Sequence, residues 1–328
     1  MTRRREWLLA AASLGLGGFG AADVHAAPAG NGYPQKPITL WVPWAAGGAT
    51  DITLRLLAEL VSVHLGQSVH VENRAGAGGT LAMPILQQAE PDGYTIAQIP
   101  QPVLRAPHTQ KVLWDPVRDV TPIIQISGVT FGLLVGAASK LRSLDDVFAF
   151  ARAHPGELSI ATNGVGTTPH IVLEELFTAR GLRYIHVPYK GTSELTLAVD
   201  TGQVMAGVNS TGFAPFVDSG RLRLLVTLAA KRSPRWPQVP TLKELGHNIV
   251  AMSPYGLGGP RGLPPAVVTV LHDAFKKAMH EPQFVQELAK YDQVLDYLGP
   301  VEYGQWLREQ YVKERLMVER MGLSRVGS

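Results

Sequence analysis

The chain contains no cysteine among its 328 residues. This absence excludes disulfide bridges, thiolate nucleophiles, cysteine-based metal sites and lipid attachment to a cysteine. Aromatic residues make up only 7% and charged residues only 17% of the chain, whereas hydrophobic residues reach 45%. These proportions are typical of a soluble globular protein, and the length predicts about two domains.

An excess of charge of one sign is also missing. The formal net charge is +3, and three of the positive charges lie at residues 3–5. Removal of residues 1–26 would also take away Glu6 and Asp23, which leaves a net charge of +2. Because no Lys/Arg-rich block occurs beyond the N-terminus, we expect no nucleic acid partner.

Signatures of enzymes are absent as well. The sequence has no G-x-S-x-G elbow, no P-loop and no H-E-x-x-H motif. Residues 15–20 match G-x-G-x-x-G, but they follow no predicted strand, so we reject a dinucleotide site. We therefore predict no catalytic activity, no cofactor and no metal site. A hydrolase built from scattered Ser, His and Asp residues is the alternative, and it would show measurable turnover.

The N-terminus has the features of an export signal. Arginines at residues 3–5 precede an uncharged stretch, 7–22, that is rich in Leu, Ala and Gly. Val24-His25-Ala26 ends in a small residue suited to cleavage, so we predict a signal peptide over residues 1–26 and a periplasmic protein. The run Arg4-Arg5-Glu6-Trp7-Leu8 is similar to a twin-arginine signal, with Sec export as the alternative.

The mature chain is organised around a strand, a small-residue loop and a helix. Residues 38–42 form an apolar run long enough for a buried strand, and Pro-Trp-Ala-Ala-Gly-Gly-Ala-Thr-Asp follows at 43–51. Such a loop can present backbone N–H groups and the positive end of a helix dipole to an anion. A tight turn that needs glycine only for steric reasons is the alternative. The helical pattern after the loop ends at Gly66 and places four residues on one face: Ile52, Leu56, Leu60 and Val63.

A second unit of the same kind follows later in the chain. Residues 158–161 predict a strand, residues 162–168 a small-residue loop, and Thr168 and Pro169 the N-cap and first residue of a helix. Because strands alternate with helices, the sequence predicts an α/β fold with parallel sheets. Two helix N-termini from different lobes that face one cleft predict a two-lobed binder of an anion.

Two segments are predicted to cross between the lobes. The uncharged segment 120–139 predicts two buried strands that meet at a turn, and the Gly/Pro-rich segment 253–265 predicts the return crossing. We therefore place lobe 1 at 27–130 plus 252–328 and lobe 2 at 131–251. The final helix, over 301–321, has four candidate inward residues: Tyr303, Leu307, Tyr311 and Leu316.

Eight short runs, in the expected order over nearly the whole mature chain, carry a family resemblance. They are YPQKPI at 33–38, VPWAAGG at 42–48, VENRAGAGG at 71–79, PDGYT at 91–95, GVGTTPH at 164–170, HVPYKG at 186–191, GRLR at 220–223 and VPT at 239–241. Together they are similar to the Bug family, the TctC-like periplasmic receptors of tripartite tricarboxylate transporters. The resemblance implies a type II periplasmic-binding-protein fold, in which each lobe is a mainly parallel sheet flanked by helices.

The resemblance also implies a carboxylate site. In the family, loops of both lobes hold a carboxylate through backbone amides, hydroxyls and ordered water, which here implicates residues 46–51 and 163–168. Trp44 departs from the phenylalanine that is usual at its position, and Met205 from a common acidic residue. The candidate ligand-binding residues are Trp44, Ala46, Gly47, Gly48, Thr50, Asp51, Asn73, Gly78, Asn163, Gly164, Gly166, Thr167, Thr168, His170, Lys190 and Asn209.

Several of these residues also have a structural interpretation. Asp51 can cap its own helix, and a neutral His170 can make a hydrogen bond within the fold. Lys190 can be an ordinary exposed lysine, Asn73 can support the first loop, and Trp44 can be a core residue. We expect a monomeric extracytoplasmic solute-binding protein that captures a small organic acid and delivers it to a tripartite tricarboxylate-type transporter. A periplasmic sensor that acts on a membrane kinase is the alternative.

Overall fold

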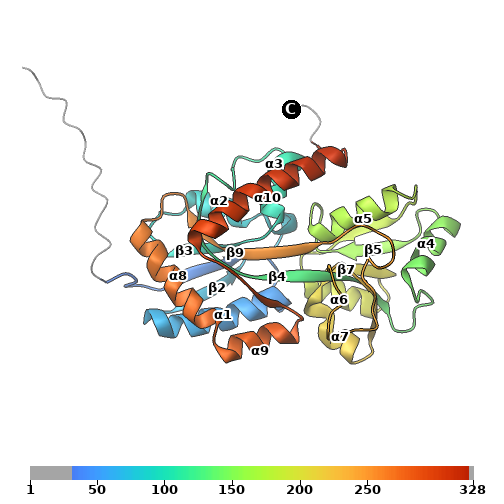
Figure 1. Ribbon diagram of the computed structural model, residues 1–328, viewed down its shortest axis with the longest axis horizontal. Helices are drawn as coiled ribbons and strands as arrows, with labels where there is room; N and C mark the ends of the chain where they lie inside the picture. The colour runs from blue at the N-terminus through green and yellow to red at the C-terminus, as the bar shows by residue number, and fades with distance from the viewer. Residues whose placement is uncertain (1–31, 325–328) are drawn as a thin grey trace, which may run out of the picture.

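The structure, a computed structural model, describes residues 32–324, so the predicted signal peptide and its twin-arginine run lie outside the described residues. Within this range the chain forms a curled sheet flanked by helices (Figure 1). The strands are β1 (Ile38–Val42), β2 (Val69–Asn73), β3 (Thr95–Ile99), β4 (Val120–Gly136), β5 (Ser159–Thr162), β6 (Ile185–Pro188), β7 (Ala206–Ser210), β8 (Leu222–Thr227), β9 (Met252–Pro260) and β10 (Val294–Leu298). The α-helices are α1 (Ala49–Leu65), α2 (Ala82–Gln88), α3 (Pro102–Thr109), α4 (Leu144–Ala153), α5 (Thr168–Thr178), α6 (Thr192–Asp200), α7 (Ala214–Asp218), α8 (Pro265–Met279), α9 (Pro282–Lys290) and α10 (Pro300–Arg320).

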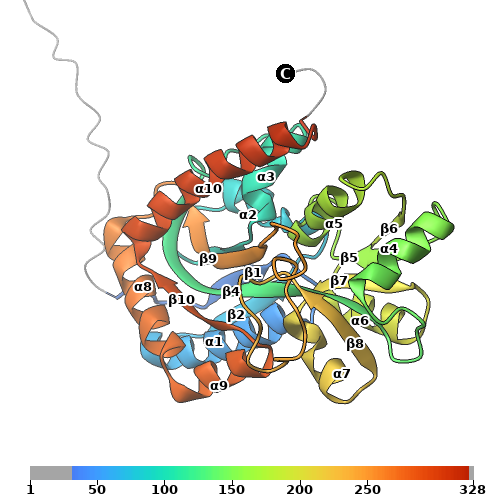
Figure 2. The ribbon, with the colours of Figure 1, turned by 45° about the vertical axis from the view of Figure 1, so that its right-hand side comes forward.

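The sheet contains two parallel groups of strands joined by antiparallel ones. Strand order is β2-β1-β3-β9-β4-β7-β5-β6, and the groups β2-β1-β3 and β6-β5-β7 are parallel. We call the part built on β1–β3, with α1–α3 and α8–α10, the first lobe, and the part built on β5–β8, with α4–α7, the second lobe (Figure 2). The carboxyl ends of β1 and β5 lead through short loops into α1 and α5.

The segment predicted as two strands and a turn is a single strand, so that prediction is wrong. Residues 120–130 of β4 pair with β9, and residues 131–136 pair with β7 and β8. Two of the three glycines of this strand, Gly128 and Gly132, serve close packing. A Cβ on Gly128 would lie 3.3 Å from Pro254 Cα, and a Cβ on Gly132 would lie 3.1 Å from Phe213 Cζ. The strand therefore runs without a turn from one lobe into the other.

The predicted inner face of α1 is only partly correct. Leu56 and Leu60 are partly buried against the core, but Val63 is 79% exposed. The buried apolar residues of the helix are Ala49, Leu54, Leu57, Ala58 and Val61. Apolar residues occur on most sides of this helix, so its sequence does not define a single stripe. In α10, Tyr303 and Leu307 are buried as predicted, but Leu316 is 53% exposed and a carboxylate, Glu314, is buried in its place.

A side-chain cap occurs at the N-terminus of only one of the described α-helices. Helix α4 begins with a complete capping box in which Ser143 and Asp146 bond each other's backbone N–H groups. Helices α1, α5 and α6 begin at Gly48, Thr167 and Gly191 with no side-chain cap. The cap of α5 is thus Thr167, one residue before the predicted Thr168. The other described α-helices also lack a side-chain cap, but first-turn residues of α1, α5 and α6 lie in the cleft.

Candidate ligand-binding site

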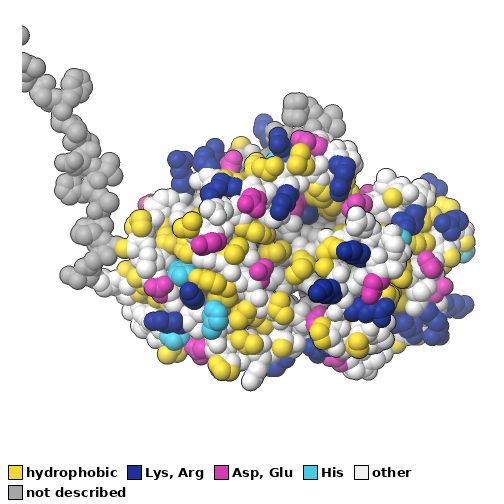
Figure 3. All heavy atoms as spheres, viewed as in Figure 1, with side chains coloured by type: hydrophobic (Ala, Val, Ile, Leu, Met, Phe, Trp, Pro, Cys, Tyr) yellow, Lys and Arg dark blue, Asp and Glu magenta, His cyan; other side chains and the backbone are white. Residues whose placement is uncertain are grey.

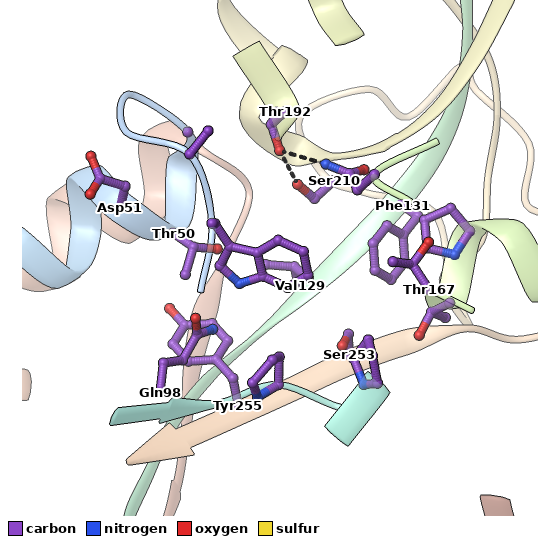
Figure 4. Close-up of a pocket in the computed structure, with 18 residues that line it drawn as sticks. Thr50, Asp51, Gln98, Val129, Phe131, Thr167, Thr192, Ser210, Ser253 and Tyr255 are labelled. Atoms are coloured by element: carbon purple, nitrogen blue, oxygen red, sulfur yellow. Dashed lines mark hydrogen bonds between the residues drawn. The ribbon is translucent and has the colours of Figure 1, made fainter. Parts of the chain in front are cut away.

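A cavity of about 600 Å³, including space open to solvent, lies between the lobes (Figure 4). Residues from β3, β4, β7 and β9, from the loops after β1, β3 and β5, and from the starts of α1, α3, α5 and α6 surround it. Its lining consists of Trp44, Ala45, Gly48, Thr50, Asp51, Gln98, Pro100, Pro102, Val129, Phe131, Asn163, Thr167, Thr168, Pro169, Thr192, Ser210, Ser253 and Tyr255.

Besides α3, which starts with a proline that has no N–H group, three helices present their N-termini to this cavity: α1, α5 and α6. The first hydrogen bonds within α1, α5 and α6 are donated by Ile52, Ile171 and Leu195. The preceding N–H groups of each first turn therefore have no acceptor inside their own helix. Each N-terminus also carries the positive end of the helix dipole. This arrangement can bind an anion without a positively charged side chain.

Hydroxyl and amide groups add further polar contacts to the cavity. Thr168 Oγ1, Asn163 Oδ1 and Gln98 Oε1 are buried and have no hydrogen-bond partner in the described part of the chain. Thr192 Oγ1 lies 3.1 Å from Ser210 Oγ and 3.3 Å from Asn163 Nδ2 (Figure 4). A buried polar atom without a partner costs free energy, so these atoms are positioned to bond a ligand.

Asp51 is the one charged residue among the residues that line the cavity in the described chain. Its carboxylate accepts hydrogen bonds from Gly47 N–H at 2.8 Å, Asn73 Nδ2 at 2.7 Å and Arg55 Nε at 3.1 Å. Asn73 Nδ2 also bonds the Trp44 carbonyl at 3.0 Å. Figure 4 shows Asp51 turned back toward its own helix. Asp51 and Asn73 therefore hold the shape of the first loop.

Positively charged side chains lie elsewhere. On the face drawn in Figure 3, Lys and Arg side chains spread over both lobes with Asp and Glu among them. Within the described residues, none lines the cavity. The attraction for an anion therefore comes from N–H groups and hydroxyls, which act strongly in a cavity of low dielectric constant.

Large apolar side chains form the rest of the wall. Val129 and Phe131 come from β4, Tyr255 comes from β9, and Trp44 comes from the loop after β1. A Cβ on Gly79 would lie 2.6 Å from Trp44 Cη2, so the glycine leaves room for the indole ring. These groups suit the carbon body of a ligand.

Seven of the sixteen predicted site residues line this cavity: Trp44, Gly48, Thr50, Asp51, Asn163, Thr167 and Thr168. Ala46 and Gly47 belong to the same loop but lie off the cavity, and the Gly47 carbonyl accepts a hydrogen bond from Ser193 Oγ at 2.9 Å. Asn209 is fully buried behind α6. Its amide donates to the Thr192 carbonyl at 3.1 Å and to Thr196 Oγ1 at 2.9 Å. It therefore supports the start of α6 from behind.

A neighbouring pocket holds Gly78, Gly164 and Lys190. Here the lobes touch, because a Cβ on Gly164 would lie 3.3 Å from Gly78 Cα. A Cβ on Gly78 would lie 2.8 Å from the Val165 carbonyl oxygen. Gly78 has a φ of +63°, which a glycine adopts most readily. These residues form part of the contact between the two lobes.

Gly166 and His170 lie on the outer side of the second loop. The Gly166 N–H donates to His170 Nδ1 at 3.2 Å, and the Gly166 carbonyl accepts from Arg105 Nη1 at 2.7 Å. The rings of His170 and His186 are 4.2 Å apart between centroids. Burial lowers the pKa of both rings, and together with the His170 charge it brings the pKa of His186 to about 4. Both rings are therefore neutral at pH 7 and brace the loop.

Several lining residues were missed by the sequence reasoning. Thr192 follows a third small loop before a helix, and the rule that found Thr168 could have found it. Gln98 lies near the carboxyl end of β3, where a ligand is also expected. Val129, Phe131 and Ser253 carry no local signal, because only the curl of β4 and β9 brings them to the cleft.

Neither a metal-binding cluster nor a membrane-spanning helix is found among the residues that the structure describes. Over residues 32–324, no group of three or more His, Asp or Glu side chains is placed to hold a metal ion. Within the same range, no helix combines the length and the apolar character needed to cross a membrane.

A family model described as the tripartite tricarboxylate transporter family receptor, TctC, matches residues 53–323. The chain belongs to this family. The chain is 44% identical over 325 residues to the "UPF0065 protein in gbd 5'region" of Cupriavidus necator, with 99% of each chain covered. It is 34% identical over 278 residues to Protein BugT of Bordetella pertussis, with 82% of this chain and 84% of BugT covered. The resemblance to the Bug family is thus confirmed, and the family consists of solute-binding receptors.

Solved structures agree with the predicted fold class. The periplasmic binding protein BugD matches with a TM-score of 0.85 and 26% identity, over 90% of this chain and all of BugD. MatC from Rhodopseudomonas palustris with bound malate matches with a TM-score of 0.81 and 27% identity, over 87% of this chain and 100% of MatC. A second R. palustris protein, with adipate, matches with a TM-score of 0.83 and 27% identity, over 90% of this chain and 100% of that protein. The two-lobed periplasmic-binding-protein fold is confirmed, with antiparallel strands β4, β8, β9 and β10 added to the parallel groups.

Proposed function

We propose that this protein is an extracytoplasmic solute-binding protein that captures a small carboxylate between its lobes for a tripartite tricarboxylate-type transporter. One observation carries the proposal: the uncapped N-termini of α1, α5 and α6 meet at a cavity that contains the unpartnered Thr168 hydroxyl. Membership in the receptor family and the malate and adipate named for two solved relatives support it.

Binding follows from the geometry of the cavity. A carboxylate at the junction of the three helices receives hydrogen bonds from the first-turn N–H groups and from Thr168 Oγ1. Hydrogen bonds to a charged group contribute about 1.5–3 kcal/mol each. Closure of the lobes excludes water and strengthens these bonds. No bond of the ligand is made or broken, so the protein binds and releases the acid unchanged.

We assign the proposed site residues to two roles. The carboxylate is bound by the loops that contain Gly48, Thr50, Asn163, Thr167 and Thr168, with Trp44 and Thr192 at their sides. A supporting group holds these loops in place: Asp51 does so from within the lining, and the other members lie outside the cavity lining. It comprises Asp51, Asn73, Gly78, Gly164, Gly166, His170, Lys190 and Asn209.

The proposed lobe boundaries follow the strand pairing. Residues 27–130 and 252–328 make lobe 1, and residues 131–251 make lobe 2. Support comes from β4, whose partner changes from β9 to β7 after Thr130, and from β9, which begins at Met252. The same proposal includes export to the periplasm by the signal peptide at residues 1–26, function as a monomer, and delivery of the acid to membrane transporter subunits.

A thermal-shift screen of the mature protein, residues 27–328, tests this function. Mono-, di- and tricarboxylates are compared with neutral amides of the same carbon skeletons. A ligand at 100 times its Kd stabilises the folded state by about 2.7 kcal/mol, which gives a measurable shift. A shift with an acid and none with its amide supports the proposal. If no acid shifts the protein, and mass spectrometry finds no co-purified acid, the proposal fails.

A further inference from the structure

The cavity offers strong donors for one carboxylate only. The N–H groups without an acceptor inside their own helix come from the first turns of α1, α5 and α6, and no Lys, Arg or His side chain of the described chain lines the cavity. A second carboxylate would need its own set of donors to replace its water shell. A dicarboxylate of the same length is therefore disfavoured by the cost of desolvating its second charged group.

An ammonium group on the ligand is disfavoured for the corresponding reason. Asp51 is the one acidic residue among the described residues of the lining. Three donors, from Gly47, Asn73 and Arg55, already occupy its carboxylate. A cation in the cavity would thus lack a free counter-charge. A zwitterionic amino acid does not match this lining.

Gln98 nevertheless requires a polar partner. It is 2% exposed, it comes from β3, and its Oε1 has no hydrogen-bond partner among the described residues. Figure 4 shows Gln98 beside Tyr255, on the opposite side of the cavity from Thr192 and Ser210. A hydroxyl group both donates and accepts, so it can bond either end of this amide. A neutral hydroxyl on the ligand would satisfy Gln98 without introducing a second charge.

The remaining wall restricts the size and polarity of the ligand. Trp44, Val129, Phe131 and Tyr255 present apolar surface between the carboxylate region and Gln98. The volume of about 600 Å³, which includes space open to solvent, suits a small ligand.

We propose that the ligand is a small monocarboxylate with one neutral hydroxyl group on a short apolar body, and that Gln98 determines this specificity by bonding the hydroxyl. The inference rests on the proposed carboxylate-binding function. To that function it adds the chemical class of the acid and one residue that determines the specificity.

Isothermal titration calorimetry with four-carbon probes tests the inference. The probes are butyrate, 3-hydroxybutyrate, 4-hydroxybutyrate, succinate, 4-aminobutyrate and the neutral butyramide. We expect one of the two hydroxybutyrates to bind at least tenfold more tightly than butyrate, succinate and 4-aminobutyrate. In the variant Gln98→Leu that advantage over butyrate disappears, while the affinity for butyrate itself changes less than threefold.

Two controls separate specificity from damage to the fold. Gln98→Met, which has an apolar side chain of similar length, must also lose the preference for the hydroxybutyrate over butyrate. Both variants must keep the wild-type melting temperature without ligand. Gln88→Leu, at an exposed glutamine, must leave all affinities unchanged. If only one of the two Gln98 variants folds, the affinities of that variant decide whether Gln98 determines the preference for a hydroxyl group.

Other outcomes overturn the inference. Succinate binding as tightly as the better hydroxybutyrate would show a second carboxylate site. An unchanged preference for the hydroxyl in the Gln98 variants would remove Gln98 from the site. Butyramide binding as well as butyrate would contradict the proposed carboxylate function itself. Tight butyrate or succinate binding without a hydroxyl preference would contradict only this inference.

Discussion

At the scale of single residues, the proposed site binds the acid through small neutral groups, and the charged groups lie behind them. Thr168 places a hydroxyl without a partner in the cavity, whereas the Asp51 carboxylate is fully hydrogen-bonded within its own lobe. A neutral donor in a buried cavity attracts an anion without the cost of burying a cation. Specificity therefore depends on the positions of individual hydroxyl and amide groups.

Thr168→Val removes one hydroxyl and keeps the shape of the side chain. Loss of a hydrogen bond to a charged group costs about 1.5–3 kcal/mol, so we expect the affinity for the acid to fall by roughly 10- to 100-fold. Calorimetric titration measures the change. Thr178→Val, at an exposed threonine of the same helix, is the matched control. Equal affinity in the Thr168 variant and the control would remove this hydroxyl from the site.

The histidine pair predicts a dependence of stability on pH. The pKa of His186 is lowered by burial to about 4, below the value of about 6.5 in an unfolded chain. Between these values the unfolded state binds more protons, so the free energy of unfolding falls as pH drops from 6.5 to 4. Because solvent screens this half-buried ring, we expect the free energy of unfolding to fall by only about 1 kcal/mol.

Urea unfolding at several pH values measures this effect. His186→Gln keeps a polar partner for Thr162, which lies 2.7 Å from His186 Nε2, and removes the titrating ring. Between pH 6.5 and 4, the free energy of unfolding should depend less on pH in the variant than in the wild type. Parallel profiles would show that another group causes the acid sensitivity.

At the scale of elements, short local patterns could be predicted and long-range packing could not. The loops after β1 and β5 were found because glycine and small residues between a strand and a helix are a local signal. The single strand β4 was missed because its glycines were interpreted as a turn, whereas they pack against Pro254 and Phe213. The buried face of α10 was missed at Glu314, because a charge is buried there only through its partner Arg105 on α3.

The pair of Arg105 and Glu314 connects three elements. Their side chains are 3% and 5% exposed and are joined at 2.6 Å, and Arg105 also bonds the Gly166 carbonyl in the second lobe. Arg105→Met leaves a buried carboxylate that still accepts a hydrogen bond from Gln101 Nε2, at 2.6 Å, but has lost its charged partner. We expect a loss of about 3–5 kcal/mol in the free energy of unfolding.

The double variant Arg105→Met, Glu314→Leu separates stability from binding. Apolar replacement of both partners removes the uncompensated charge, so most of the stability should return. The Gly166 carbonyl still lacks its donor, so the affinity for the acid should stay several-fold below the wild-type value. Urea unfolding and calorimetric titration measure the two quantities. Full recovery of both would show that Arg105 acts on stability alone.

At the scale of the whole molecule, the two lobes meet through residues with little or no side chain. A Cβ on Gly191 would lie 2.7 Å from Ala45 Cβ in the opposite lobe, and a Cβ on Gly212 would lie 3.4 Å from Ala49 Cβ. The position of the cavity depends on this contact and on the curl of β4 and β9. Neither can be read from a local run of sequence, which is why Phe131 and Tyr255 were not predicted as lining residues.

Gly191→Ala tests the role of this close contact. Gly191 has an extended backbone with φ of −170°, so alanine causes no backbone strain there. The added methyl group should instead keep the lobes apart, with unchanged thermal stability and at least tenfold weaker binding of the acid. Small-angle scattering with saturating acid should show a larger radius of gyration than for the wild type. Wild-type affinity in Gly191→Ala would contradict the role of this contact.

The most direct test of the central claim is a crystal structure of the mature protein with the acid that gives the largest thermal shift. The carboxylate should lie between the lobes, within hydrogen-bond distance of Thr168 Oγ1 and of backbone N–H groups at the N-termini of α1, α5 and α6. No Lys or Arg side chain should contact it. A carboxylate paired with Lys190 or an arginine, or bound outside this cavity, would contradict the claim.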